Sequence, residues 1–253
     1  MITQNIDFAQ LALYAFWIFF AGLIYWLRKE DRREGYPLEK DIPRMVGSTT
    51  NILIPKPKTF LLPDGGEYHA PDFKRDTREF EITRTSVSAG STSTPTTENP
   101  LLAGVGPSSY AERHDEPELT REGHVAIVPM RVAADYKVSA GHDVRGWDLM
   151  GADGEVGGKI KDIWVDRAEM IVRYLEVGLG ESGDEVRLVP VNMVVVQGDK
   201  KYVEVEALHS TQLGLAPTLK QDEQITVMEE ERIVAFFAGG RLYAEPKRLG
   251  PVV

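Results

Sequence analysis

The chain has 253 residues, a formal net charge of -10 and no cysteine. The acidic balance argues against nucleic acid as a partner, because phosphate binding needs a basic surface. The lack of cysteine excludes disulfides, thiolate zinc sites, iron–sulfur clusters and c-type haem attachment. The five histidines (His69, His114, His124, His142 and His209) are scattered and form no local metal-binding motif.

The first feature along the chain is an almost uncharged apolar run of 20 residues, Phe8–Leu27. About 20 helical residues cross a hydrocarbon core of ~30 Å. A cleaved signal peptide is disfavoured, because an acidic segment precedes the run and bulky residues follow it where small ones would be cleaved. A buried core helix is disfavoured because the run is apolar on every face. We therefore predict one transmembrane helix at about residues 8–28.

The residues that flank this helix predict its orientation. Asp7 precedes it and basic residues follow it, so the positive-inside rule places the N-terminus in the periplasm and the C-terminal side in the cytoplasm. The residues expected at the membrane interface are Tyr25, Trp26, Arg28, Lys29, Arg32 and Arg33. Near mid-span, Trp17, Ala21 and Gly22 predict a face that packs closely against a partner helix.

Residues 36–115 are expected to be an extended surface segment that is rich in Pro, Gly and Ser. The stretch "ILIPKPKTFLLPDGGEYHAPDF" contains repeated prolines, which block both helix and central strand. The stretch "SVSAGSTSTPTTENP", residues 86–100, has hardly a charge. Taken alone, its composition favours a flexible linker. The alternative is an extended strap held by another protein.

From about residue 116 the pattern becomes that of a β-rich globular domain, residues 116–253. The stretches "HVAIVPMRVA", "VGGKIKDIWVDR", "IVRYLEVGL", "VRLVPVNMVVV" and "YVEVEAL" are apolar, β-branched or alternating, and Gly/Asp turns separate them. This spacing predicts a small antiparallel sheet or a partly open barrel. "TVMEEERIVAFFAGGRLYA" predicts a short C-terminal helix with an acidic front, which Gly239 and Gly240 should end.

The sequence carries no catalytic signature. Nucleophile elbows, phosphate-binding loops and dinucleotide fingerprints are all missing, so we expect a non-catalytic protein. The most notable charged group is "DIWVDRAEMIVR", with Asp162, Asp166, Glu169 and Arg173. If Asp166 and Glu169 flank a strand–turn–strand, they point the same way. A solvated turn is the plain interpretation, and a proton relay of titratable groups is the functional alternative.

Six blocks along the chain carry a resemblance to a known family. They are "FWIFFAGLIYWLRKEDRREGYPLE", "PKPKTFLLPDGG", "NPLLAGVGPSSYAER", "VPMRVA", "DIWVDRAEMIVRYLEV" and "EEERIVAFFAGGRLYAEPKR". Together and in this order they resemble the H subunit of the photosynthetic reaction centre of purple bacteria. The resemblance covers about residues 7–248.

The resemblance implies a single N-terminal transmembrane helix (residues 1–35 with its flanks) and a cytoplasmic domain of the PRC-barrel type. It implies a subunit that binds no pigment itself and caps the L and M subunits in the bacterial inner (intracytoplasmic) membrane. Those subunits carry bacteriochlorophyll, bacteriopheophytin, quinones, non-haem iron and carotenoid. Membrane lipids and the core light-harvesting antenna are further expected partners. On this basis the Ser/Thr/Pro stretch is expected to be an ordered strap.

The resemblance also implies site residues. Asp166 and Glu169 match the acidic positions of the family's proton path to the secondary quinone, and Arg173 matches a neighbouring arginine. His124 matches one surface histidine of the proton-uptake point. Some members have His-Gly-His there, whereas this chain has Glu122-Gly123-His124. The alternative function is a single-pass membrane anchor whose cytoplasmic β-barrel domain is a protein-interaction module.

Overall fold

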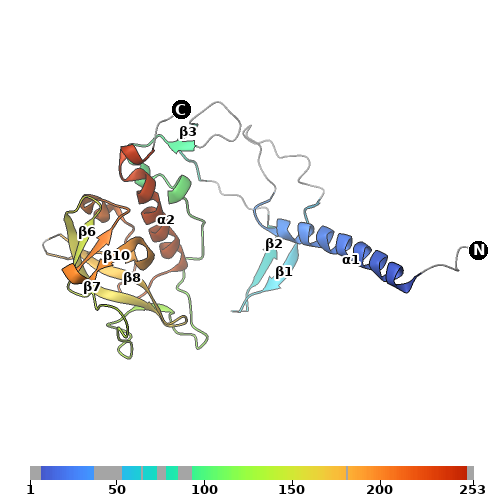
Figure 1. The fold of residues 1–253 in the computed structure, drawn as a ribbon, viewed down its shortest axis with the longest axis horizontal. Helices are drawn as coiled ribbons and strands as arrows, with labels where there is room; N and C mark the ends of the chain where they lie inside the picture. The colour runs from blue at the N-terminus through green and yellow to red at the C-terminus, as the bar shows by residue number, and fades with distance from the viewer. Residues whose placement is uncertain are drawn as a thin grey trace, which may run out of the picture. The chain divides into compact units, whose positions relative to one another are not determined.

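The computed structural model describes residues 7–36, 53–63, 65–72, 78–84, 93–180 and 182–249. The chain divides into two compact units, residues 1–78 and 79–253. The sequence predicted boundaries near residues 35 and 115 instead, and this three-part division stays a prediction. Figure 1 shows the elements of each unit.

Helix α1, Phe8–Glu30, is the long apolar element of the first unit. Asp7 caps it by accepting the N–H of Ala9 at 3.0 Å, which satisfies one of the free donors of the first turn. The apolar side chains along the helix are exposed to the surroundings, and none of its residues is buried. The segment Phe8–Arg33, 26 residues, is long and apolar enough to cross a membrane. The predicted helix at residues 8–28 is confirmed.

A β-hairpin follows within the same unit. It consists of β1 (Lys58–Leu61) and β2 (Glu67–Ala70), which pair antiparallel. The Arg33 side chain fixes the base of the hairpin, because its Nη1 donates to the carbonyl oxygens of Lys56 at 3.0 Å and Ala70 at 2.7 Å. The prolines before β1 agree with the predicted extended chain, but the paired strands were not predicted.

The second unit is built on a seven-stranded sheet in the order β10-β11-β6-β7-β8-β9, with β5 paired to β7. Its strands are β5 (Ile127–Pro129), β6 (Asp148–Gly151), β7 (Val156–Asp166), β8 (Ile171–Leu179), β9 (Glu185–Pro190), β10 (Val194–Gln197) and β11 (Tyr202–Val205). The mainly-β prediction is confirmed. One pair, β11–β6, is parallel, unlike the expected antiparallel sheet.

The strands agree with the predicted stretches to different degrees. β8 occupies the predicted residues 171–179, whereas the stretch at 186–196 forms two strands, β9 and β10. A 3-10 turn separates them directly after Pro190, which has no N–H to donate to a ladder. β6, which is four residues long, was not predicted.

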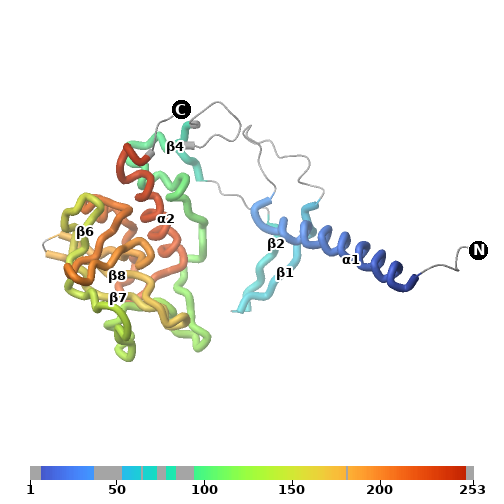
Figure 2. The backbone as a smooth tube through the Cα atoms, in the orientation of Figure 1, coloured from blue at the N-terminus to red at the C-terminus, as the bar shows by residue number. Residues whose placement is uncertain are grey.

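Helix α2, Val227–Tyr243, lies against the sheet and 3-10 segments of the same unit (Figure 2). Its start is fixed by a capping box, in which Thr226 accepts the N–H of Glu229 at 3.1 Å and Glu229 accepts the N–H of Thr226 at 2.8 Å. The predicted C-terminal helix is confirmed, and its acidic front lies in the first turn.

The prediction that Gly239 and Gly240 end this helix is wrong, because α2 continues through both to Tyr243. The glycines are needed for close packing instead. A Cβ on Gly239 would lie 2.6 Å from the Cβ of Ser108, and one on Gly240 would lie 2.8 Å from the carbonyl oxygen of Ala207. The helix therefore touches its neighbours through its own backbone.

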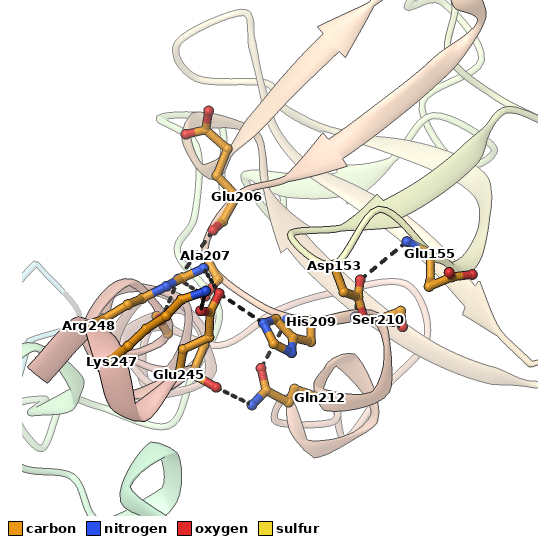
Figure 3. Close-up of polar contacts among 12 residues, drawn as sticks. Asp153, Glu155, Glu206, Ala207, His209, Ser210, Gln212, Glu245, Lys247 and Arg248 are labelled. Carbon is orange, nitrogen blue, oxygen red and sulfur yellow. Dashed lines mark hydrogen bonds and ion pairs between the residues drawn. The ribbon is translucent and has the colours of Figure 1, made fainter.

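The end of α2 is held by a cluster around Glu245 (Figure 3). One carboxylate oxygen lies 3.1 Å from Nε2 of His209 and accepts Nη2 of Arg248 at 2.8 Å. Arg248 also donates to the carbonyl oxygen of Ala207 at 3.2 Å. Contacts with Lys247, His209 and Arg248 hold the pKa of Glu245 at about 2. The cluster thus ties the helix to the chain segment that follows β11.

The Ser/Thr/Pro stretch is described only in part, since residues 85–92 lie outside the described ranges. Its later part forms β4 (Ser93–Pro95), which pairs with β3 (Ile82–Arg84). The chain then reaches α2, where Leu101 and Ser108 are both 3% exposed. Tyr243 of α2 donates to the carbonyl oxygen of Val105 at 3.1 Å. The residues directly after this stretch are therefore packed on the domain, and the expected strap over partner subunits stays a prediction.

Replacing Gly240 with Ala tests the close packing of α2. Helix propensity alone would favour the alanine by about 1 kcal/mol. We expect the opposite sign, a loss of about 1–3 kcal/mol in the free energy of unfolding, because the new methyl overlaps the fixed carbonyl oxygen of Ala207. Denaturant titration of the full chain in detergent measures it. Gly214→Ala is the control, since its Cβ meets nothing within 4 Å. Equal stability of both variants would contradict the packing role.

Candidate functional site

The turn between β7 and β8 brings the predicted acidic residues together. Asp166 ends β7 and is 3% exposed. Its Oδ1 accepts the N–H of Ala168 at 2.9 Å and of Glu169 at 3.1 Å, the bonding pattern by which an aspartate stabilises a tight turn. Met170 completes the turn with a φ of 58°. The sequence interpretation of a strand–turn–strand is confirmed here.

Arg173, on β8, bridges the two carboxylates. Its Nη2 lies 3.1 Å from Oδ2 of Asp166 and 2.8 Å from Oε2 of Glu169. The side chain of Asp166 is only 4% exposed, whereas that of Glu169 is 57% exposed. Burial lowers the pKa of Arg173, but the two carboxylates outweigh it and leave this pKa raised. The cluster therefore links a carboxylate in water to one inside the protein.

A further acid, Glu230 of α2, contacts β8 beside this cluster, and the sequence interpretation missed it. Tyr174, next to Arg173 on β8, donates its hydroxyl to Oε2 of Glu230 at 2.8 Å. Burial raises the pKa of Glu230, with smaller raising contributions from Glu118 and Asp166, against the lowering effect of Tyr174 and Arg173. Burial and Glu230 also raise the pKa of Tyr174. The sequence did not single out Glu230 among the three glutamates at the start of α2, since all three suit the positive end of the helix dipole equally well.

Glu122 and His124 lie on an exposed turn before β5. The turn is closed by the N–H of Thr120, which donates to the carbonyl oxygen of His124 at 2.7 Å. Nε of Arg167, from the β7–β8 turn, donates to the carbonyl oxygen of Val125 at 3.0 Å. The two turns therefore lie at the same end of the sheet. Among the described residues, no hydrogen bond or ion pair joins Glu122 or His124 to the Asp166 cluster.

Asp162 does not belong to this cluster. It is buried in a separate network with Arg131, whose backbone N–H reaches its Oδ2 at 3.0 Å. Nη1 of Arg131 also lies 2.6 Å from Oε2 of Glu176, which accepts the indole N–H of Trp164 at 2.8 Å. Along β7, Asp162 and Asp166 are four residues apart, yet Asp162 is held near the middle of the strand and Asp166 at its end.

The predicted membrane residues all lie on or just after α1. Trp17 packs edge-on against Phe16 and Phe20 and is 55% exposed, and Ala21 and Gly22 are also on the outside of the helix. Of the predicted interface residues, Arg33 is turned onto the hairpin and only 10% of its side chain is exposed. The others in that set are Tyr25, Trp26, Arg28, Lys29 and Arg32. Their contacts with lipid or a partner helix stay predictions.

Two family models match this chain. Residues 1–132 match the N-terminal region of the photosynthetic reaction centre H-chain, and residues 137–212 match the PRC-barrel domain. The chain belongs to the photosynthetic reaction centre H-chain family. The H-chain match covers more than half of the chain, and the PRC-barrel match covers the sheet from β6 to β11.

Membership confirms the predicted resemblance and the coarse function, a subunit of a photosynthetic reaction centre that associates with other subunits. The H-chain is a structural subunit of that complex, and its apolar N-terminal helix indicates membrane association. Within the H-chain, the Asp166 cluster occupies one end of the PRC-barrel sheet.

The raised pKa of Glu230 makes a pH-dependent prediction. Because the folded chain holds this proton above the ordinary pKa of 4.5, Glu230 contributes stability below pH 4.5 that is lost as pH rises through the folded pKa. Glu230→Gln mimics the protonated acid. We therefore expect it to raise the free energy of unfolding at pH 8 and to leave it unchanged at pH 4.

Denaturant titrations at both pH values measure this difference. Glu231→Gln is the matched control, because it removes the next charge along α2 and so has a similar effect on the helix dipole. Its partner Arg113 is a half-exposed side chain, so losing that ion pair should matter little. If Glu230→Gln and Glu231→Gln respond to pH in the same way, the special environment of Glu230 is refuted.

Proposed function

We propose that this chain caps the cytoplasmic face of the L and M subunits and supplies part of the route by which protons reach their secondary quinone. The observation that carries the proposal is the series of acids at one end of the sheet. Glu169 is in water, Asp166 is buried behind it, and Glu230 is held with a raised pKa beside Tyr174. Reduction of a quinone to quinol takes up protons, so a chain of such groups suits the task.

Each group has a distinct part in this proposal. Glu169, Glu122 and His124 are exposed and exchange protons with water. Arg173 donates hydrogen bonds to both Asp166 and Glu169, and this shared guanidinium fixes the position of both carboxylates. Beside Tyr174, burial makes Glu230 retain a proton to a higher pH than a free glutamate does. Protons would pass from the exposed groups inward.

The proposal places α1 across the bacterial inner (intracytoplasmic) membrane, with its N-terminus in the periplasm. The basic residues Arg28 and Lys29 in the last turn support this orientation. Trp17, Ala21 and Gly22 would then face a helix of the core, and the antenna and lipids would surround the rest. The cap would also shield the quinone region from water.

The proposal assigns the pigments, quinones and iron to the partner subunits, and no catalytic role to this chain. Among the described residues, no group of three or more His, Asp or Glu side chains could hold a metal ion. The alternative, a membrane anchor with an interaction module, explains only the PRC-barrel match. The H-chain match extends past the helix to residue 132, which favours the reaction-centre role.

Purification tests the partnership. We expect this chain, isolated in mild detergent from a photosynthetic membrane, to carry near-infrared bacteriochlorophyll absorbance only when two larger membrane subunits come with it. The absorbance should disappear from this chain once those subunits are stripped away. A colourless, monodisperse protein obtained from the native membrane without them would contradict the proposal.

Flash-induced kinetics test the proton route. We expect Glu169→Gln and Asp166→Asn to slow the second, proton-coupled electron transfer to the secondary quinone and to leave primary charge separation unchanged. The expected slowing is about tenfold, less than the ~100-fold effect of a sole proton donor, because neighbouring acids offer parallel routes. Glu155→Gln, in the exposed β6–β7 turn, is the control. Wild-type kinetics in both variants at neutral pH would remove these residues from the route.

A further inference from the structure

The β1–β2 hairpin has apolar side chains where a soluble hairpin would have polar ones. Leu61 is 79% exposed, and Phe60, Leu62 and Tyr68 are each between 38% and 42% exposed. They lie in or next to the strands, at the end of the hairpin where the chain turns. Arg33 lies over the ring of Phe60, 6.0 Å from its centroid, and Leu61 is the most exposed of the four. Exposed apolar patches of this kind mark contacts with another phase or molecule.

The base of the hairpin is fixed to the last turn of α1. Both carboxylate oxygens of Glu30 accept from Arg33, at 2.8 and 2.9 Å, and one accepts Nζ of Lys58 at 2.8 Å. Arg33 also donates to the carbonyl oxygens of Lys56, before β1, and Ala70, the last residue of β2, so both bonds lie at the base of the hairpin. The hairpin therefore cannot move away from the helix end without breaking this network.

The hairpin runs in a different direction from α1 (Figure 1). In Figure 1 the hairpin leaves the C-terminal end of α1 sideways and does not continue along the helix axis. The charges that begin at Arg28 mark where the apolar part of α1 ends. A helix of 23 residues is about 35 Å long, slightly more than the ~30 Å hydrocarbon core, so its last turn lies among the lipid headgroups.

We propose that the β1–β2 hairpin lies in the headgroup layer of the membrane, with Leu61 and Leu62 inserted at the boundary with the acyl chains. The inference rests on the proposed span of α1 but not on its orientation or its partners. The exposed Lys56 and Lys58 at the base suit anionic lipids, and the leucines at the tip suit the acyl boundary. The hairpin thereby fixes the depth and rotation of α1.

Site-directed spin labelling tests this in the assembled complex, reconstituted in vesicles of phosphatidylcholine with some phosphatidylglycerol. Because the chain has no cysteine, Leu61→Cys gives it a single thiol for labelling. Thiols of partner subunits are removed or blocked beforehand. Accessibility of the label to oxygen, which dissolves in lipid, is compared with accessibility to a water-soluble nickel chelate. We expect oxygen to dominate at Leu61→Cys.

Two reference variants give the accessibilities expected for a label in lipid and for a label in water. Ile18→Cys, 76% exposed in mid-helix, reports lipid, and Glu206→Cys, exposed after β11, reports water. A nickel-accessible label at Leu61→Cys would overturn the proposal in favour of water. A label that is immobile and reached by neither reagent would overturn it in favour of a protein contact. A nickel-accessible label at Ile18→Cys would instead refute the span itself, so the two failures are distinguishable.

Discussion

The pairing of β7 with β8 is the constraint on which the rest of the second unit depends. The two strands run from Gly158 opposite Leu179 to Asp166 opposite Ile171. At one end the ladder requires glycine, because a Cβ on Gly158 would lie 2.5 Å from the carbonyl oxygen of Gly178. At the other end Asp166 closes the turn. β5 and β6 pair with β7, and β9 pairs with β8, so this hairpin sets the sheet and the place of its acids together.

The second constraint is the close approach of α2, which completes the site from the other side. The start of the helix brings Glu230 to Tyr174, and further along it Gly239 and Gly240 let the helix backbone touch the neighbouring segments. The packing of α2 therefore also places an acid next to β8. Burial then raises the pKa of Glu230, since a carboxyl that is removed from water retains its proton to a higher pH. Fold and site are two results of one packing arrangement.

The sequence predicted what depends on neighbouring residues and missed what depends on distant ones. The bounds of β8, the apolar helix and the turn that joins Asp166 to Glu169 follow from local pattern, and all were predictable. The Tyr174–Glu230 contact joins residues 56 positions apart, so no local spacing signals it. Asp162 was grouped with Asp166 because they are close in sequence, but strand geometry separates them. Gly239 and Gly240 look the same in the sequence whether they end a helix or allow it to pack closely. Only the neighbouring segments in the fold distinguish the two roles.

The two units manage charge in opposite ways, and this division is consistent with one subunit having two tasks. In the first unit, two cations, Arg33 and Lys58, share the one carboxylate of Glu30 at the end of an apolar helix, and Arg33 also holds the hairpin backbone in place. In the second, one arginine serves two carboxylates at the end of the sheet, which leaves an excess of acid. The net charge of the whole chain, -10, has the same sign as this excess. The network with an excess of positive charge fixes the position of the hairpin, and the network with an excess of negative charge lies at the end of the sheet.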